Sequence, residues 1–453
     1  MTDPAPRPAQ DPERHGRRAV WIAFLLTMVG TAAVYKAKAE DDRSAIIRWH
    51  HQVVELRSGT NIWNKYYFPN PPIFPISLYP LTMLPPVDAA MVWFGVKSVL
   101  AAVCLLACMK MAIPKGVKFP WWAQGAVVLL ALRPVMGDLF HANNNLIILS
   151  LIVAMLAAWR RGYDVLAGLL LALAITYKVT PALFVPYFLY KRSWKTVAAT
   201  CVGIVLFVAV IPSLVLGPAF NLECLTAWYR RILGPYMEDG TTSNQEVNQS
   251  MIGVLTRLMT VGGKAVAHGY AGVQFQGNLV AWPPKVVAIL LKIVSLGLVG
   301  LLAFFCRTKT DRRDDPRLLG EFSLVVLTML FASERSWKHH FVTVMLPQAY
   351  LVARMAILPG SKTRRWLIGF ALLGSAFLMA CTSKDFGSIF GKDGHVVAQF
   401  YGLFFLAGVV LYVLTAWCVW VERGSPIAMA ERMSRNAIPE PHLGAKCAAV
   451  DRH

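Results

Sequence analysis

Ionisable side chains follow the first long apolar segment of the chain, where charged groups can do chemistry at a membrane surface. The cluster Glu40-Asp41-Asp42-Arg43 comes directly after an apolar segment near residues 19–35. A carboxylate at the mouth of a membrane cavity loses part of its hydration and can then act as a general base near neutral pH. We therefore predict that Asp42 is such a base, with Asp41 as an equally placed alternative. The ordinary interpretation is a solvated carboxylate paired with Arg43.

A second ionisable cluster lies at 333–340, with the sequence Ser-Glu-Arg-Ser-Trp-Lys-His-His. Lysine, arginine and histidine side chains offer the donors and positive charge that a phosphate needs. Lys338, His339 and His340 are therefore candidate phosphate ligands. Adjacent positions on a helix point about 100° apart, so this histidine pair does not predict a metal site. The alternative is an anchor at the membrane interface, in which Lys338 extends toward the headgroups.

Lys178 interrupts an apolar segment that runs from Leu169 to Pro186. An ammonium group in such a segment is costly unless it faces water or an anion. Lys178 is therefore a further candidate for binding an anion. The alternative is a helix end where the lysine reaches the interface, because Pro181 follows closely.

Two segments, 141–145 and 244–249, are rich in amide side chains. An amide both donates and accepts hydrogen bonds, which suits the hydroxyl groups of a sugar. For each amide, helix capping and ordinary loop hydrogen bonding are the alternative roles. The candidate sugar- or acceptor-binding residues in these segments are His141, Asn143, Asn248 and Gln249.

The composition indicates a membrane protein that crosses the bilayer many times. Of the 453 residues, 56% are hydrophobic and 15% are charged, whereas soluble domains carry about 25% charged residues. Apolar segments of about 17–25 residues can span the hydrocarbon layer as helices. The sequence therefore predicts an all-α polytopic fold with roughly ten to twelve transmembrane helices. The apolar segments, some of them short, lie near 19–35, 88–112, 121–139, 145–159, 163–177, 179–190, 196–216, 285–305, 318–333, 339–356, 366–382 and 398–420.

The net charge of +20 is concentrated in alternate connections between these segments, which is the positive-inside pattern of membrane proteins. It predicts that both termini are cytoplasmic and that the loops around Asp42, Asn143, Asn248 and Lys384 lie outside. A nucleic-acid partner is not expected. The alternative at the N-terminus is a cleavable signal peptide ending near Ala37-Lys38-Ala39. Its removal would leave an odd number of helices, which disagrees with the basic C-terminal tail.

The first outer loop carries its own structural signals. Residues 46–57 have one apolar face and predict an amphipathic helix at the outer interface. Prolines repeat through 69–86, which predicts broken backbone along a cavity wall, since irregular backbone at membrane depth needs protein or water to satisfy it. We expect three regions along the chain: a disordered N-terminus at 1–18, a transmembrane domain at 19–420 and a cytoplasmic tail at 421–453. The eight cysteines show no metal-ligand spacing.

Several short segments, in this order, resemble glycosyltransferase family 87, the polyprenol-phosphate-mannose-dependent transferases of the GT-C fold. The resemblance covers roughly residues 40–350, and the order of the segments is more specific than any one of them. The segments are Asp42, Gly59 to Trp63, Tyr67-Phe68-Pro69-Asn70-Pro71-Pro72, His141-Ala142-Asn143-Asn144-Asn145, Ala174 to Pro181, Asn248-Gln249-Ser250 with Arg257, and Ser336-Trp337-Lys338-His339-His340.

The resemblance implies a GT-C-like bundle with re-entrant and outer-loop helices. It implies transfer of a hexose, with mannose expected, from a polyprenyl-phosphate donor to a glycolipid or glycan acceptor, with inversion. Asp42 would be the base on the outer face of the cell membrane, and no metal or other cofactor is expected. The donor phosphate would be bound by Lys178, Arg257, Lys338, His339 and His340. The sugar or acceptor would be bound by Arg43, Asn70, His141, Asn143, Asn248 and Gln249.

Two other functions stay open at this point. A transporter or flippase of lipid-linked sugars would show broken helices at matching positions in two halves of the chain. The breaks here concentrate near 69–86 and 178–186, without a matching second half. The other alternative is a membrane glycan ligase or polymerase that uses an arginine- and histidine-rich outer loop.

Overall fold

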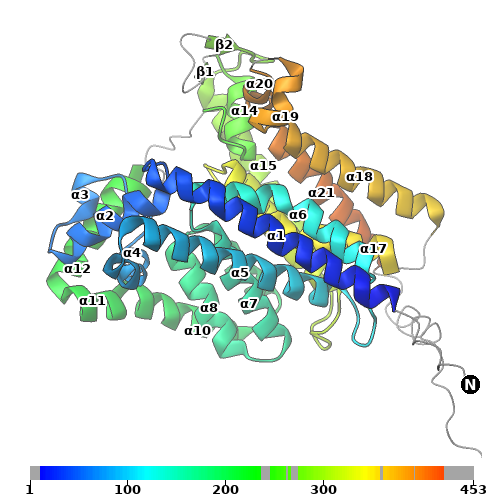
Figure 1. The fold of residues 1–453 in the computed structure, drawn as a ribbon, viewed down its shortest axis with the longest axis horizontal. Helices are drawn as coiled ribbons and strands as arrows, with labels where there is room; N and C mark the ends of the chain where they lie inside the picture. Colours follow the sequence, from blue (N-terminus) through cyan, green and yellow to red (C-terminus); the bar gives the residue numbers. More distant parts are fainter. Residues whose placement is uncertain are drawn as a thin grey trace, which may run out of the picture.

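The computed structural model describes residues 11–235, 245–261, 264–266, 274–357, 361–391 and 393–422. In these ranges the protein is a bundle of helices, and the prediction of an all-α polytopic membrane protein is confirmed (Figure 1). Eight helical segments are long and apolar enough to cross a membrane. They are α1 Pro12–Glu40, α5 Pro86–Ala112, α6 Trp121–His141, Trp194–Leu216 (α10 Trp194–Val205, η3 Leu206–Val210 and α11 Ile211–Leu216), α15 Pro284–Phe305, Lys338–Ile357 (η5 Lys338–Val344 and α17 Met345–Ile357), α18 Lys362–Cys381 and α21 Leu403–Val421.

Shorter elements complete the described chain. Three of them are apolar helices inside the bundle: α7 Asn145–Arg160, α8 Asp164–Tyr177 and α16 Arg317–Ala332. The others are α2 Ala45–Arg57, α3 Ile62–Lys65, α4 Ile73–Ser77, η1 Tyr79–Met83, η2 Thr180–Leu183, α9 Phe184–Tyr190, α12 Pro218–Trp228, η4 Tyr229–Leu233, α14 Met251–Met259, α19 Lys384–Gly387, η6 Ser388–Phe390 and α20 Gly394–Phe400. A single antiparallel pair of three-residue strands, β1 Lys264–Val266 and β2 Gln274–Gln276, is present among the described residues.

The first helix begins earlier than the sequence boundary at residue 19. Asp11 caps α1, because its side-chain oxygen accepts a hydrogen bond from the backbone N–H of Glu13 at 3.1 Å. Pro12 occupies the first helical position, where a missing N–H costs nothing. Part of the segment predicted to be disordered, 12–18, is therefore helical. Residues 1–10 and 423–453 lie outside the described residues.

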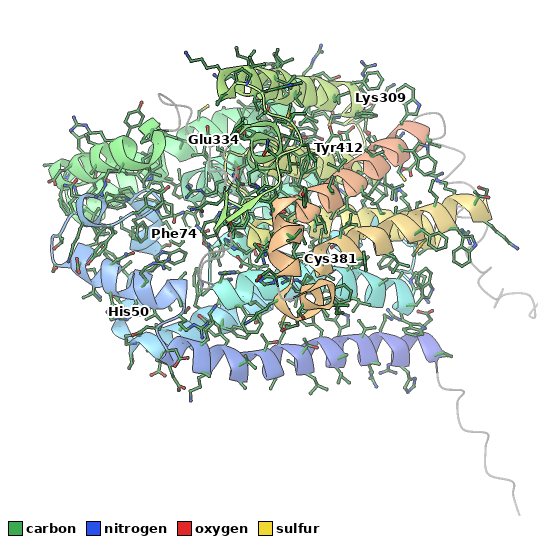
Figure 2. All side chains as sticks on the ribbon, turned by 90° about the horizontal axis from the view of Figure 1, so that it is seen from above. His50, Phe74, Lys309, Glu334, Cys381 and Tyr412 are labelled. Atoms are coloured by element: carbon green, nitrogen blue, oxygen red, sulfur yellow. The ribbon has the colours of Figure 1, made fainter. Side chains whose placement is uncertain are left out.

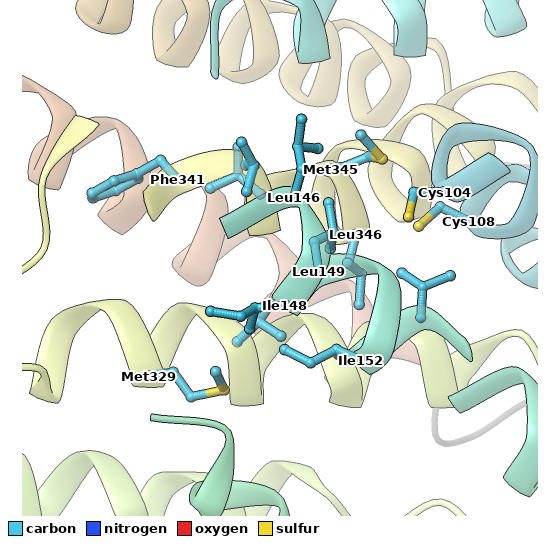
Figure 3. Packing of buried hydrophobic residues seen from close by; sticks show 14 of the residues in the cluster. Cys104, Cys108, Leu146, Ile148, Leu149, Ile152, Met329, Phe341, Met345 and Leu346 are labelled. Atoms are coloured by element: carbon cyan, nitrogen blue, oxygen red, sulfur yellow. The ribbon is translucent and has the colours of Figure 1, made fainter. Parts of the chain in front are cut away.

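The core of the bundle is formed by α16 and α17, which other helices surround. In α16 the residues from Leu318 to Phe331 are all buried. Figure 3 shows how α7 packs here, with Ile148 and Ile152 beside Met329 of α16 and with the buried thiol groups of α5 nearby. A helix that is apolar around most of its circumference is expected to be buried in such a core.

Peripheral helices instead present apolar side chains outward. Leu25 and Leu26 of α1 are 61% and 65% exposed, and Leu296 of α15 is 74% exposed. Figure 2 shows α1 along one edge of the bundle. Exposed apolar surface of this extent is that of a protein surrounded by lipid, so these helices form the lipid-facing perimeter.

Close helix packing depends on glycine between α8 and α10. A Cβ atom at Gly168 would lie 2.4 Å from the backbone oxygen of Thr196, and one at Gly203 would lie 2.6 Å from Ala172 Cβ. Small residues let helix backbones approach closely in membranes, where dispersion contacts rather than hydrophobic transfer drive association. The two glycines therefore allow α8 to pack closely against α10, and this packing positions the residues that follow α8.

The segment that the sequence predicts to be the first outer loop forms a compact end of the molecule. As predicted, 45–57 is an amphipathic helix, and its apolar face is buried through Ile46, Trp49, Val53 and Leu56. The proline-rich segment is broken into α4 and η1, also as predicted. Figure 1 shows α2, α3, α4 and α12 together at this end. Figure 2 shows His50 of α2 and Phe74 of α4 there.

Candidate functional site

A cavity lies at the break between α8 and η2, where Lys178 interrupts helical structure. Lys178 has extended backbone (φ −158°, ψ 127°), and Pro181 in η2 prevents α8 from continuing. The polar part of the cavity lining consists of Asn145, Lys178, Thr180, Ser333, Ser336, His340 and Thr343. The apolar part consists of Ile148, Val326, Met329 and Leu330. One cavity therefore combines cationic and amide groups with an aliphatic wall.

The Lys178 ammonium is held by an amide rather than by a carboxylate. Its Nζ atom donates to Asn145 Oδ1 at 3.0 Å. Within the described residues no carboxylate lies within ion-pair distance of Lys178. The remaining donor capacity of an ammonium, which has three N–H groups, is therefore available to an anion in the cavity.

The histidines of the 333–340 cluster extend from this cavity toward the end of α6. His340 Nδ1 accepts a hydrogen bond from the Trp337 backbone N–H at 3.2 Å, which assigns the neutral-ring proton to Nε2. The His340 and His339 rings lie 4.7 Å apart, and the His339 and His141 rings also lie 4.7 Å apart. Asn143 Nδ2 donates to His339 Nε2 at 2.9 Å. The structure thus brings His141, Asn143, His339 and His340 together.

Lys338 lies beside this group, but its ammonium is directed to another element. Its Nζ atom donates to the backbone oxygen of Thr382, at the end of α18, at 3.1 Å. Lys338 is also within Coulombic range of His141 and His339. It therefore adds positive charge to the histidine group without lining the Lys178 cavity.

Asp42 lies on the turn that leaves α1, four residues after Lys38. The side chain of Lys38, one turn earlier, donates to the backbone oxygen of Phe140, the neighbour of His141. Asp42 has φ +55°, a left-handed conformation that aspartate and asparagine tolerate better than most residues. Asp41, Asp42 and Arg43 are all exposed. The Asp42 carboxylate forms no ion pair with Arg43 in the described structure.

The amides at 248–249 hold the loop that carries the second cluster. Asn248 Nδ2 donates to the Glu334 oxygen at 2.7 Å, and Asn248 Oδ1 accepts from the Ser336 N–H at 2.9 Å. The Gln249 N–H donates to the Ser336 oxygen at 2.6 Å. Both amide side chains are fully buried. The structure therefore places Asn248 and Gln249 behind the cavity wall rather than in it, and Asn244 lies outside the described residues.

Arg257 is placed apart from the Lys178 cavity. Its side chain has an exposed fraction of 0%, and its three nitrogen atoms donate to backbone oxygens of four residues. These bonds go to Phe400 (3.3 and 3.2 Å), Gln245 (2.6 Å), Asn248 (2.9 Å) and Gln399 (3.2 Å). The guanidinium thus ties α14 to the end of α20 and does not line the cavity with Lys178. This arrangement does not support the predicted contact between Arg257 and a phosphate.

Asn70 supports the Lys178 break from behind. Its Nδ2 atom donates to the Tyr177 oxygen at 2.7 Å, directly before Lys178. The Asn70 backbone oxygen in turn accepts from Trp63 Nε1 at 3.0 Å. Asn70 is buried, so it positions the backbone of the cavity wall instead of reaching into the cavity.

Two residues that sequence reasoning did not select lie directly behind the cavity. Lys97 of α5 and Asp138 of α6 form a fully buried ion pair with a Nζ–Oδ2 distance of 2.7 Å. Each interrupts an apolar segment, and ionisable residues inside transmembrane segments are candidates for function. The criterion that selected Lys178 would therefore have found them.

The fold and this site are those of a membrane-embedded enzyme: a helical bundle with a cationic, amide-lined cavity at a broken helix. The model of glycosyltransferase family 87 matches residues 68–333, more than half of the chain. The protein therefore belongs to that family and is a glycosyltransferase. The alternative of a transporter of lipid-linked sugars is not supported.

Two curated relatives come from Mycolicibacterium smegmatis (strain ATCC 700084 / mc(2)155). A polyprenol-phosphate-mannose-dependent alpha-(1-2)-phosphatidylinositol pentamannoside mannosyltransferase is 25% identical over 368 residues, which cover 79% of this chain and 78% of the relative. A polyprenol-phosphate-mannose-dependent alpha-(1-2)-phosphatidylinositol mannoside mannosyltransferase is 26% identical over 269 residues, which cover 58% of this chain and 53% of that relative.

Proposed function

We propose that the protein transfers mannose from a polyprenyl-phosphate donor to a glycolipid or glycan acceptor on the outer face of the cell membrane. The observation that best supports this proposal is the cavity, whose lining combines Lys178 and His340 with aliphatic side chains. A lipid monophosphate has both an anionic head and an isoprenoid chain, so it matches both parts of this lining. The donors named for the two relatives support the same choice.

In this proposal the cavity binds the leaving group. The Lys178 ammonium stabilises the charge that develops on the phosphate oxygen as its bond to the anomeric carbon breaks, and His340 lies in the same cavity lining. Preformed donors in a site of low polarity are effective because they need no reorganisation during the reaction. Ile148, Met329 and their aliphatic neighbours contact the first isoprene units.

Asp42 accepts the proton of the acceptor hydroxyl. The acceptor oxygen attacks the anomeric carbon from the face opposite the phosphate, so that the new bond forms with inverted configuration and polyprenyl phosphate departs. This assignment is supported by a series of contacts that links the helical turn before Asp42 to the cavity lining. Lys38, on the turn of helix before Asp42, contacts Phe140, and His141 leads through His339 to His340 in the cavity lining.

We assign the acceptor and the sugar hydroxyls to Arg43, His141 and Asn143, none of which lines the Lys178 cavity. His141 and Arg43 are exposed and Asn143 is half-buried, so a substrate can reach them. The basic side chains Lys38 and Lys338 near His141 favour an acceptor that carries negative charge.

The test uses purified protein, radiolabelled polyprenyl-phosphate-mannose and a membrane lipid extract as acceptor. Asp42→Asn removes the charge without adding strain, since asparagine also tolerates the left-handed backbone. We expect its turnover to fall by about 10²–10⁴-fold, the usual contribution of a general base. The matched control Asp41→Asn should keep near wild-type turnover.

Two results would contradict parts of this proposal. If the wild-type protein transfers no sugar from this donor to any lipid of the extract, the proposed donor is wrong. If Asp41→Asn is inactive while Asp42→Asn is active, the base is Asp41.

A further inference from the structure

The cavity is backed by a chain of hydrogen bonds that begins at the buried Lys97–Asp138 pair. Asp138 Oδ2 contacts Lys97 Nζ at 2.7 Å, and Lys97 Nζ also donates to the Asp138 backbone oxygen at 2.8 Å. Both side chains have exposed fractions of 0%. Asp138 therefore has its counter-ion on the side of α5, away from the cavity.

The other oxygen of Asp138 is bound to the cavity lining. Asp138 Oδ1 accepts from Asn145 Nδ2 at 3.0 Å, and Oδ2 also accepts from the Leu146 N–H at 3.3 Å. Because the amide nitrogen of Asn145 faces the carboxylate, its oxygen faces Lys178 Nζ at 3.0 Å. A carboxylate accepts only, so Asp138 fixes which end of the Asn145 amide the lysine meets.

The charges of this chain do not balance. Lys97 and Lys178 each contribute one positive charge and Asp138 one negative charge, which leaves a net charge of +1. Lys97 pairs directly with Asp138, so the unbalanced charge lies on Lys178, at the cavity. A buried ammonium needs an opposite charge, and an anion in the cavity supplies it.

We propose that Lys97, Asp138 and Asn145 are positioning residues that keep the Lys178 ammonium oriented and unneutralised for the phosphate of a lipid donor. Lys97 occupies Asp138 so that this carboxylate does not cancel the charge of Lys178. Asp138 orients Asn145, and Asn145 directs Lys178 to the cavity. This inference rests on the proposed function, because the anion is the phosphate that the transfer reaction releases.

The experiment measures binding separately from transfer. Farnesyl phosphate, which has an isoprenoid chain and a monophosphate, is titrated into the purified full-length protein, with farnesol as the uncharged control. Lys97→Met leaves Asp138 without its counter-ion and with Lys178 as a remaining cation within its Coulombic range. We expect the Kd for farnesyl phosphate and the KM for the donor to rise by about tenfold or more, as for the loss of a nearby charge. The binding of farnesol should stay unchanged.

The double variant Lys97→Met/Asp138→Asn is the decisive comparison. It removes both charges of the pair, and the amide oxygen introduced at position 138 can still accept from Asn145, so Lys178 again carries the unbalanced charge. We expect its Kd for farnesyl phosphate to return to within about threefold of the wild-type value, well under one tenfold step. The two ligands distinguish the roles, because a purely structural role of the pair would weaken and restore the binding of farnesol together with that of farnesyl phosphate. Lys97→Gln, which can still hydrogen-bond to Asp138, replaces the methionine variant if that protein does not fold.

The outcomes separate this inference from the proposed function. If the wild-type protein binds farnesyl phosphate no better than farnesol and transfers no mannose, the proposed function fails. If the wild-type protein transfers mannose but Lys97→Met and Lys97→Gln bind farnesyl phosphate with unchanged Kd, the positioning role is overturned. A double variant as weak as the single variant overturns it as well.

Discussion

Replacing Arg257 tests whether this side chain has a structural role or binds the donor phosphate. In the structure the guanidinium is fully buried and directs its donors to the backbone oxygens of Gln245, Asn248, Gln399 and Phe400. The oxygens of Gln245 and Gln399 also accept from Asn248 N and Gly402 N. Replacing Arg257 with methionine removes its charged donors from all four oxygens.

The expected loss of stability follows from the removal of these charged donors. A hydrogen bond to a charged group contributes about 1.5–3 kcal/mol, so the loss of several such bonds in Arg257→Met should lower the free energy of unfolding by about 3 kcal/mol or more. For a chain of this size that corresponds to a fall of the apparent unfolding temperature on the order of 5 °C. Arg257→Lys, which retains three donors, should lose less.

The assay is thermal unfolding of the purified protein in detergent, together with the donor KM of the fraction that remains folded. We expect a lowered unfolding temperature and an unchanged KM for Arg257→Met. Arg230, which is exposed on η4, supplies the matched control, since Arg230→Met should change neither quantity. An unchanged unfolding temperature combined with a tenfold higher KM would refute this reasoning and make Arg257 a donor-binding residue.

Three further predictions test the packing, the topology and the outer loop. Gly168→Leu should destabilise the protein by about 1–3 kcal/mol through overpacking of α8 against α10. Gly297→Leu on α15, where a Cβ atom meets nothing within 4 Å, should leave the stability unchanged. Equal unfolding temperatures for the two variants would contradict this account of the packing. A cysteine at Ser58 should react with a membrane-impermeant thiol reagent on intact cells and one at Lys118 only after permeabilisation, because the positive-inside pattern places 58 outside; the reverse labelling would invert the topology. Hydrogen bonds from Tyr66 and Lys65 lower the pKa of Glu55 below its ordinary value of 4.5, so the ionised carboxylate stabilises the outer loop above that pH and the contribution is lost as the pH falls through the lowered pKa. The protection factors of the amides at 55–66, which correct for the slower intrinsic exchange in acid, should therefore fall in acid for the wild-type protein and change less for Glu55→Gln.

Much of the fold follows from local features of the sequence. A helix in the hydrocarbon layer must satisfy its backbone within itself, so apolar length alone located α5, α6 and α15 close to their observed limits. The amphipathic face of α2 was also visible, because helical periodicity needs only thirteen neighbouring residues. The start of α1 was missed, since its polar first turns lie beyond the apolar segment and depend on the Asp11 cap.

For the site, the sequence identified several of the functional side chains, and the packing of the helices then showed what each of them contacts. The chain alone selected Lys178, because an ionisable group in an apolar segment requires a reason wherever it folds. It selected His339 and His340 because a cluster of basic side chains suits a phosphate. It could not separate Lys178, which faces a cavity, from Arg257, which binds backbone oxygens. It also did not join Lys97 to Asp138, 41 residues apart on neighbouring helices. The partner of a charged side chain is set by which helices pack together, and that is a property of the assembled bundle rather than of any one segment.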